Sequence, residues 1–192
     1  MLSLQYPLIL ASKSPRRAQL LREAGIPFEI KTKEVEEIYP DDLSVDQVAQ
    51  YLAVLKAESC RSFIQRKDDL LLAADSVVIL GDTIFGKPKD KADAFHTLRA
   101  LSGQVHQVTT GVCLLSQNEK VAFSESSKVH FEELTDEEIE YYIEQYQPYD
   151  KAGSYAIQEW IGLCKISKIE GTYANIMGLP VDKVYRVLSA WQ

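Results

Sequence analysis

A single carboxylate interrupts the most apolar stretch of the chain. Asp75 lies within Leu70–Leu80, in which Ser76 is the only other polar residue. An ionised carboxylate in such a stretch is costly unless it faces a partner, a metal ion or a cleft. Asp75 could cap a neighbouring loop, but the pattern favours a side chain that takes a proton from water or holds a divalent cation.

A second group of chemically active side chains follows the first apolar segment. The run Ser12-Lys13-Ser14-Pro15-Arg16-Arg17 predicts a helix start, with Ser14 as N-cap and Pro15 at the first helical position. Backbone N–H groups, the helix dipole and two guanidinium groups all favour an anion there. The same residues could equally form a plain cap with two solvated arginines. Neither G-x-x-x-x-G-K-S/T nor G-x-G-x-x-G occurs in the sequence, so this turn is not a P-loop or a dinucleotide-binding loop.

Two lysines and one glutamine are further candidates. Lys87 lies twelve residues after Asp75 across a tight turn, so it can approach the same cleft. Lys56 lies near the apolar face of a predicted helix, where a lysine usually extends its ammonium into solvent. Gln158 ends the segment Asp150–Gln158, whose small residues and one amide could contact a flat ring. Alone, that segment indicates little.

Other chemistries fit the sequence poorly. The 3 cysteines lie far apart with no C-x-x-C pair, which disfavours a zinc site and a disulfide framework. The 3 histidines show no spacing typical of a serine–histidine–acid triad. The net charge of −7 has the wrong sign for a protein that binds the nucleic-acid backbone.

Apolar periodicity predicts a mixed α/β domain over residues 1–192, with a twisted sheet flanked by helices. The strands expected are Leu8–Ala11, Pro27–Thr32, Leu70–Leu80, Thr83–Phe85, Val105–Leu115, Val121–Phe131 and Gly162–Ile169. The helices expected are Ser14–Ala24, Ser44–Phe63, Asp90–Leu101, Thr135–Tyr146 and Pro180–Trp191. No segment resembles a signal peptide or a membrane span. We therefore expect a cytoplasmic protein with no membrane partner.

Six sequence blocks, in this order, resemble the Maf family of nucleoside triphosphate pyrophosphatases. They are Leu10–Arg17 followed by Leu20-Leu21, Ala74-Asp75-Ser76, Gly86-Lys87-Pro88, Leu101–His106, Asp150–Tyr155 and Gly171–Pro180. The resemblance covers nearly the whole chain. It implies an elongated α/β fold with two lobes around a central cleft, shared with the inosine triphosphatases. It also implies cleavage of a nucleoside triphosphate between the α and β phosphates.

The resemblance also implies roles for individual residues. Asp75 matches the proton acceptor of the family. The residues that match the family's phosphate contacts are Ser14, Arg17, Lys56 and Lys87. In the family, a glutamate matching Glu37 lies near a divalent metal ion, which can be Mg²⁺, Mn²⁺ or Co²⁺, and Asp75 would also hold this ion. The sequence does not distinguish Glu37 from the adjacent Glu36 in this role. The family often forms homodimers, so a second copy of the chain is an expected partner beside the nucleotide substrate.

Three positions divide the family by substrate. The branch that acts on dTTP and UTP has an arginine at the position of Arg16, a threonine at that of Ser76 and a glutamine at that of Gln158. At the same three positions, the 7-methyl-GTP branch has a bulky apolar residue, a glutamine and a glutamate. A neutral amide can pair with the donor and acceptor edge of a pyrimidine, whereas glutamate suits a cationic methylguanine. Ser76 lacks one methyl group but keeps the hydroxyl. The resemblance thus implies a dTTP/UTP pyrophosphatase, with a 7-methyl-GTP pyrophosphatase or a non-enzymatic regulator of septum formation as alternatives.

Overall fold

A mixed sheet of seven strands organises residues 7–191, the part of the chain that the computed structural model describes. The strand order is β2-β1-β3-β5-β6-β7, and β4 pairs with β3. Strand β1 is parallel to β2 and β3, whereas β3–β4 and β6–β7 are antiparallel. The strands are β1 (Leu8–Leu10), β2 (Phe28–Ile30), β3 (Leu71–Leu80), β4 (Thr83–Phe85), β5 (Val105–Leu115), β6 (Lys120–Phe131) and β7 (Ile166–Glu170). The predicted α/β class is confirmed.

Helices occupy both the connections and the C-terminal part of the chain. They are α1 (Pro15–Glu23), α2 (Val45–Ser59), α3 (Lys91–Leu101), α4 (Asp136–Tyr146), α5 (Trp160–Cys164), α6 (Tyr173–Met177) and α7 (Val181–Ala190). Short 3₁₀ turns are η1 (Arg61–Phe63), η2 (Pro148–Asp150) and η3 (Ala152–Ser154). Within residues 7–191, no helix has the length and apolar character needed to cross a bilayer.

The chain divides into two compact units that share three strands. The first unit comprises the described residues up to Asp75, Thr110–Glu125, and those from Gly178 onward. The second comprises Ser76–Thr109 and Ser126–Met177. Strands β3, β5 and β6 therefore each begin in one unit and end in the other. The predicted central cleft and the arrangement of two lobes around it stay predictions.

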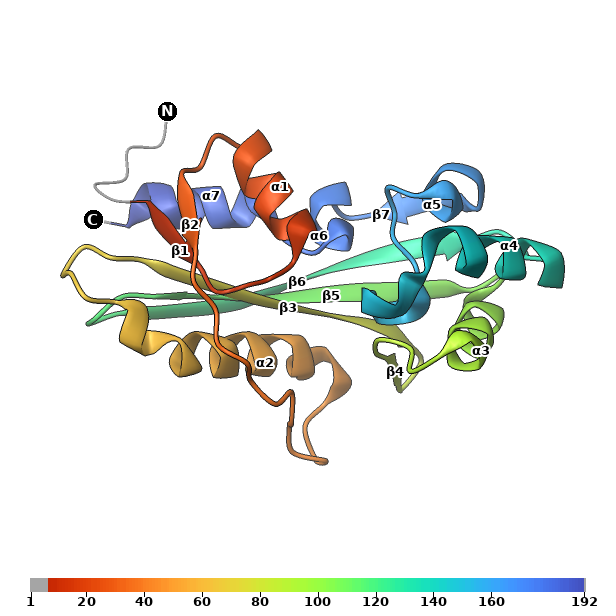
Figure 1. Ribbon diagram of the computed structural model, residues 1–192, viewed down its shortest axis with the longest axis horizontal. Helices are drawn as coiled ribbons and strands as arrows, with labels where there is room; N and C mark the ends of the chain where they lie inside the picture. Colours follow the sequence, from red (N-terminus) through yellow and green to blue (C-terminus); the bar gives the residue numbers. More distant parts are fainter. Residues whose placement is uncertain (1–6, 192) are drawn as a thin grey trace. The chain divides into compact units, whose positions relative to one another are not determined.

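Helix α2 covers one sheet face of the first unit, and α1 and α7 cover the opposite face (Figure 1). The α2 face is built from small and branched residues, including Ile9, Ala53 and Ala57, all fully buried. Gly111 on β5 allows the helix to approach closely, because a Cβ there would lie 2.2 Å from the Ala49 carbonyl oxygen on α2. This close approach places the N-terminal half of α2 against the sheet.

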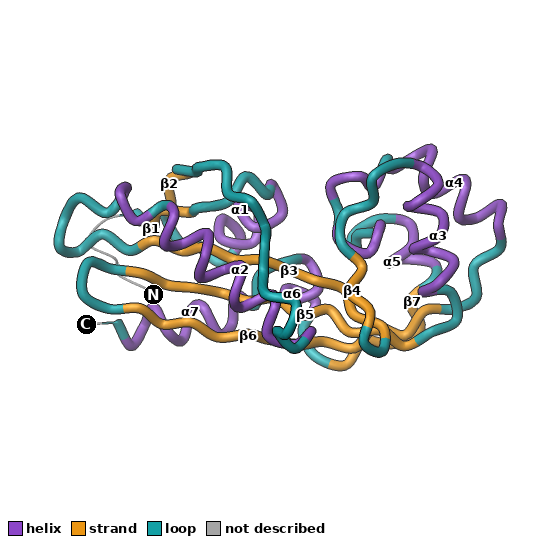
Figure 2. Tube along the Cα trace, turned by 90° about the horizontal axis from the view of Figure 1, so that it is seen from below, coloured by secondary structure: helices purple, strands orange, loops and turns teal. Residues whose placement is uncertain are grey.

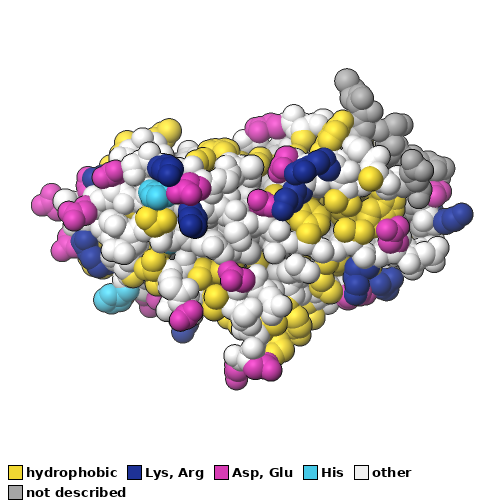
Figure 3. Space-filling model, turned by 180° about the vertical axis from the view of Figure 1, so that it is seen from behind, with side chains coloured by type: hydrophobic (Ala, Val, Ile, Leu, Met, Phe, Trp, Pro, Cys, Tyr) yellow, Lys and Arg dark blue, Asp and Glu magenta, His cyan; other side chains and the backbone are white. Residues whose placement is uncertain are grey.

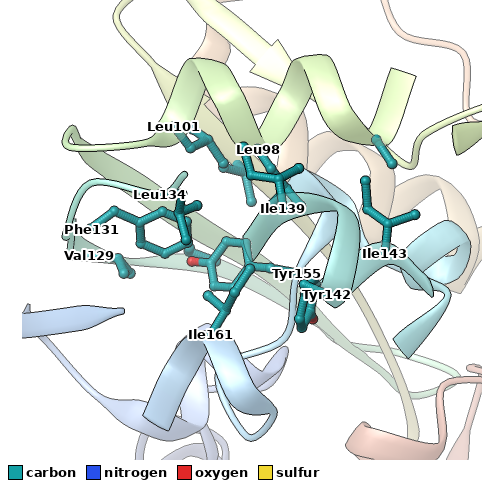
Figure 4. Packing of buried hydrophobic residues seen from close by; sticks show 13 residues of the cluster. Leu98, Leu101, Val129, Phe131, Leu134, Ile139, Tyr142, Ile143, Tyr155 and Ile161 are labelled. Atoms are coloured by element: carbon teal, nitrogen blue, oxygen red, sulfur yellow. The ribbon is translucent and has the colours of Figure 1, made fainter. Parts of the chain in front are cut away.

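The second unit has its own apolar core, around which α3, α4 and α5 gather (Figure 2). Helix α3 supplies Leu98 and Leu101, and α4 supplies Ile139, Tyr142 and Ile143 (Figure 4). A capping box between Thr135 and Glu138 begins α4, as the sequence predicts. This core holds the C-terminal half of α4 firmly against the segment that follows it.

Two expected elements differ from the structure. The helix expected over Ser44–Phe63 ends at Ser59, and a separate 3₁₀ turn follows. The strand expected over Gly162–Ile169 begins only at Ile166, because residues 160–164 form α5. A Cβ at Gly162 would lie 1.6 Å from the Ile157 carbonyl oxygen, so this glycine permits a tight helical turn. Helix α6 was not predicted, since five residues are too few to show helical periodicity.

Basic and acidic side chains are interspersed over the face of the molecule drawn in Figure 3. Exposed charged side chains also form ion pairs, such as Arg186–Asp182 at 2.8 Å. Exposed pairs of this kind contribute on the order of 0–1 kcal/mol each. Exposed ion pairs of this kind therefore contribute little to the stability of the fold.

Candidate functional site

Asp75 and Glu37 share one cationic partner, the Lys56 ammonium. Lys56 Nζ lies 2.7 Å from Glu37 Oε1 and also donates to Asp75 Oδ1. The side chains of Lys56 and Asp75 are only 17% and 10% exposed, whereas that of Glu37 is 42% exposed. The interpretation of Lys56 as a solvent-directed lysine is therefore wrong: its ammonium ends against two carboxylates.

Local structure explains how Lys56 reaches these carboxylates. It lies in the last turn of α2 between Ala53 and Ala57, which are fully buried toward the sheet. Asp75 stands in the middle of β3, at the end of the part that belongs to the first unit. A carboxylate there loses most of its hydration, and the ion pair with Lys56 offsets that cost. The apolar sequence around Asp75 thus contains an ionic centre.

Arg17 joins the same electrostatic group from α1. Its Nε donates to the Gly178 carbonyl oxygen at 2.8 Å, and its Nη1 donates to Ser12 Oγ at 3.2 Å. Loss of hydration lowers the pKa of the Arg17 guanidinium, while the negative charges of Asp75 and, more weakly, Glu37 oppose that change. The group consequently contains two carboxylates, an ammonium and a guanidinium, all in the first unit.

The start of α1 retains the features of an anion site. Pro15 occupies the first turn, and Ser14 has the extended backbone of an N-cap. Within the described residues, the Ser14 hydroxyl makes no capping hydrogen bond to the helix; instead the Ser14 amide donates to Ser12 Oγ at 3.2 Å. Arg16 is half-buried in the first turn. The helix N-terminus, with its dipole, and the Ser14 hydroxyl remain compatible with phosphate binding.

Glu37 and Glu36 are now distinguished by contact. Glu37 Oε1 faces Lys56 and Asp75, whereas Glu36 is an exposed residue with no ion pair in the described residues. Two carboxylates that converge on one cation supply hard oxygen donors suited to Mg²⁺ or Mn²⁺, which often complete their coordination with water and substrate phosphates. Within residues 7–191, no group of three or more His, Cys, Asp or Glu side chains forms a metal cage.

The other three predicted residues belong to the second unit. Ser76, the residue after Asp75 on β3, is half-buried, and Lys87 is exposed. The loop before Lys87 is anchored by the Gly153 amide, which donates to the Gly86 carbonyl oxygen at 3.1 Å. Gln158 is half-buried, and its Oε1 atom is buried without a hydrogen-bond partner among the described residues.

Several residues that hold the charged side chains in place were not among the predicted site residues. Ser12 and the Gly178 carbonyl hold Arg17. In the second unit, Lys151 has an 8% exposed side chain and pairs with Asp150 at 2.9 Å and Glu159 at 3.4 Å. The sequence signal that could have identified Lys151 is its place before the small residues Ala152, Gly153 and Ser154, which leave room for a buried ammonium.

Comparisons with known proteins identify the family of the chain and several of its relatives. A family model described as Maf-like protein matches residues 7–191. A dTTP/UTP pyrophosphatase of Porphyromonas gingivalis is 51% identical over 186 residues, covering 96% of this chain and 94% of that protein. A dTTP/UTP pyrophosphatase of Phocaeicola vulgatus is 48% identical over 185 residues, covering 96% and 95%. The solved structure of the Staphylococcus aureus Ham1 protein matches with a TM-score of 0.46 at 12% identity, covering 66% of this chain and 72% of that one.

Proposed function

Because the chain belongs to the Maf family, whose model matches residues 7–191, we propose that it hydrolyses dTTP and UTP to the nucleoside monophosphate and pyrophosphate. The names of relatives at 51% and 48% identity over nearly the full chain support this substrate class. The structural observation that carries the proposal is the partly desolvated Asp75 carboxylate, held by Lys56 beside Glu37 and Arg17.

Asp75 accepts a proton from the attacking water in this proposal. The water oxygen forms a new bond to the α phosphorus as the anhydride bond between the α and β phosphates breaks. Pyrophosphate leaves with the electron pair of the broken bond. The low exposure of Asp75 strengthens its interaction with a positioned water. No covalent intermediate is required, and catalysis rests on positioning and charge stabilisation.

Positive groups hold the triphosphate. In the first unit these are Arg17, Lys56 and the start of α1 at Ser14; in the second unit, Lys87 is proposed for the same role. Guanidinium and ammonium groups balance the charge that develops on the phosphate oxygens. Arg17 is well prepared for this, because Ser12 and Gly178 already fix its orientation.

Glu37 and Asp75 would hold a divalent metal ion, Mg²⁺, Mn²⁺ or Co²⁺. When bound, it would supply charge neutralisation for the leaving pyrophosphate. The convergence of both carboxylates on one cationic group supports the assignment of Glu37 rather than Glu36. The carboxylates would then exchange the Lys56 ammonium for contact with the ion and leave Lys56 to the phosphates.

Gln158, Ser76 and Arg16 select the base in this proposal. A neutral amide offers both a donor and an acceptor, which matches the edge of thymine or uracil. The buried Gln158 Oε1 has no hydrogen-bond partner among residues 7–191, which supports a role for this atom toward a ligand.

A substrate panel tests the proposed function directly. The protein is incubated with Mg²⁺ and equal concentrations of dTTP, UTP, GTP or 7-methyl-GTP, and the products are separated by ion-exchange chromatography. We expect dTTP and UTP to give monophosphate and pyrophosphate at least tenfold faster than the two purines. Exclusive hydrolysis of 7-methyl-GTP would favour the other branch of the family. Hydrolysis of none of the four would favour the non-enzymatic regulator.

A further inference from the structure

One buried hydroxyl holds both flanks of the turn that carries Gln158. The Ala156 amide donates to Tyr142 Oη at 3.0 Å, and the Tyr142 hydroxyl donates to Glu159 Oε2. The turn itself is closed by the Glu159 amide, which donates to the Ala156 carbonyl oxygen at 3.1 Å. Gln158 therefore lies between two residues that are tied to the same oxygen atom.

Tyr142 is a rigid anchor for this turn. Its side chain is fully buried in the second-unit core (Figure 4). Its ring stacks on that of Tyr146, with centroids 4.9 Å apart. Burial, followed by the bond to the Glu159 carboxylate, raises the pKa of the Tyr142 hydroxyl, which therefore keeps its proton. The hydroxyl donates its proton to Glu159 and accepts a hydrogen bond from the Ala156 amide, so both of its hydrogen bonds go to this turn.

Other contacts hold the same turn in place. Lys151 Nζ lies 3.4 Å from Glu159 Oε1, the oxygen that Tyr142 does not use. On the other side, Gly162 of α5 approaches the Ile157 carbonyl so closely that no side chain fits between them. The backbone on both sides of Gln158 is consequently fixed, while its buried Oε1 has no partner among the described residues.

We propose that Tyr142 is a positioning residue for base selection, because its hydroxyl fixes the turn from which the Gln158 side chain extends. This inference rests on the proposed base-reading role of Gln158. Uracil and cytosine present opposite donor and acceptor patterns on the pairing edge. An amide that extends from a mobile turn can adjust to either pattern, whereas an amide that extends from a fixed turn meets only one of them in good geometry. The choice of UTP over CTP therefore depends on the rigidity that Tyr142 provides.

Tyr142→Phe removes the hydroxyl and keeps the ring. Tyr155→Phe is the matched control, since Tyr155 is a buried tyrosine of the same core whose hydroxyl bonds His106 at 2.7 Å instead. We expect Tyr142→Phe, which loses two hydrogen bonds, to lower the ratio of kcat/KM for UTP to that for CTP about tenfold, through KM more than through kcat. Tyr155→Phe should retain the wild-type ratio, with a comparable shift in Tm. An unchanged ratio in Tyr142→Phe overturns the proposal.

A double-mutant cycle separates this inference from the proposed function. In a Gln158→Ala background, adding Tyr142→Phe should leave the UTP-to-CTP ratio unchanged, because Tyr142 acts through Gln158. If the wild type hydrolyses no pyrimidine triphosphate, the proposed function and this inference fail together. If Gln158→Ala lowers the ratio but Tyr142→Phe does not, only the positioning role fails. Should Tyr142→Phe not fold, Glu159→Gln weakens the same bond from the acceptor side and must lower the ratio as well.

Discussion

The Lys56 ammonium on α2 forms an ion pair with the Asp75 carboxylate on β3, and both side chains are largely shielded from water. The two residues are 19 positions apart in the sequence, and Glu37, which shares the ammonium, lies 19 positions before Lys56. The ion pair offsets the loss of hydration of a carboxylate in an apolar strand, and this carboxylate also interacts electrostatically with the Arg17 guanidinium.

Asp75→Asn should abolish most turnover while leaving the fold intact. The amide has nearly the same size, and Lys56 keeps its contact with Glu37 at 2.7 Å. Removal of one preorganised charged group typically costs about 10²–10³ in rate. The measurement is kcat for dTTP together with the thermal unfolding midpoint. Wild-type turnover in Asp75→Asn would show that another group accepts the proton.

Glu37→Gln should raise the Mg²⁺ concentration needed for half-maximal activity by about tenfold, the lower end of the cost of losing a metal-site partner. Glu36→Gln is the matched control: the adjacent glutamate is exposed, and its variant should behave as the wild type. Titration of Mg²⁺ after treatment with EDTA measures the effect in all three proteins. An equal shift in both variants would contradict the assignment of Glu37 and indicate a general effect of surface charge.

The stability of the second unit should fall in acid because of His106. Burial lowers the pKa of His106 from 6.5 to about 4 in the folded protein. The folded state therefore binds its proton less readily than the unfolded state, so the stabilisation is fully present above pH 6.5 and is lost as the pH falls toward 4. The shift corresponds to about 3 kcal/mol.

The measurement compares urea unfolding of the wild type and His106→Gln at several pH values between 7.5 and 4. Carboxylates that titrate in the same range affect both proteins, so the difference in unfolding free energy isolates the histidine. We expect that difference to shrink as the pH falls. A difference that stays constant over this range would mean that folding does not change the proton affinity of His106.

Cysteine accessibility should differ sharply along the chain. Cys164 at the end of α5 is exposed, whereas Cys60 and Cys113 are buried. Burial also raises the pKa of the Cys113 thiol to about 11, so little reactive thiolate forms near neutral pH. A native chain should take up one equivalent of a thiol reagent at pH 8, and the Cys164→Ser variant should take up none in the same time. Rapid labelling of that variant would place a second thiol at the surface.

Local sequence signals predicted several elements accurately. The capping box at Thr135 and the hairpin turn at Gly81 both form as expected, because each depends on residues within a few positions of one another. The isolated carboxylate in Leu70–Leu80 also marked Asp75 as unusual without any knowledge of its neighbours. Helix α5 was missed, because five residues display too little periodicity to be separated from the following strand.

By itself, the sequence determined the fold class, the family and the set of groups available for chemistry, since these depend on residue types and their local spacing. Only the tertiary structure decided how those groups are paired. Lys56 points toward Glu37 and Asp75 rather than water, and Tyr142 connects Ala156 with Glu159 across 14 and 17 positions of sequence. A long side chain or a hydroxyl bonds to whatever polar group the packed backbone brings within reach, and that distance is set by the whole fold.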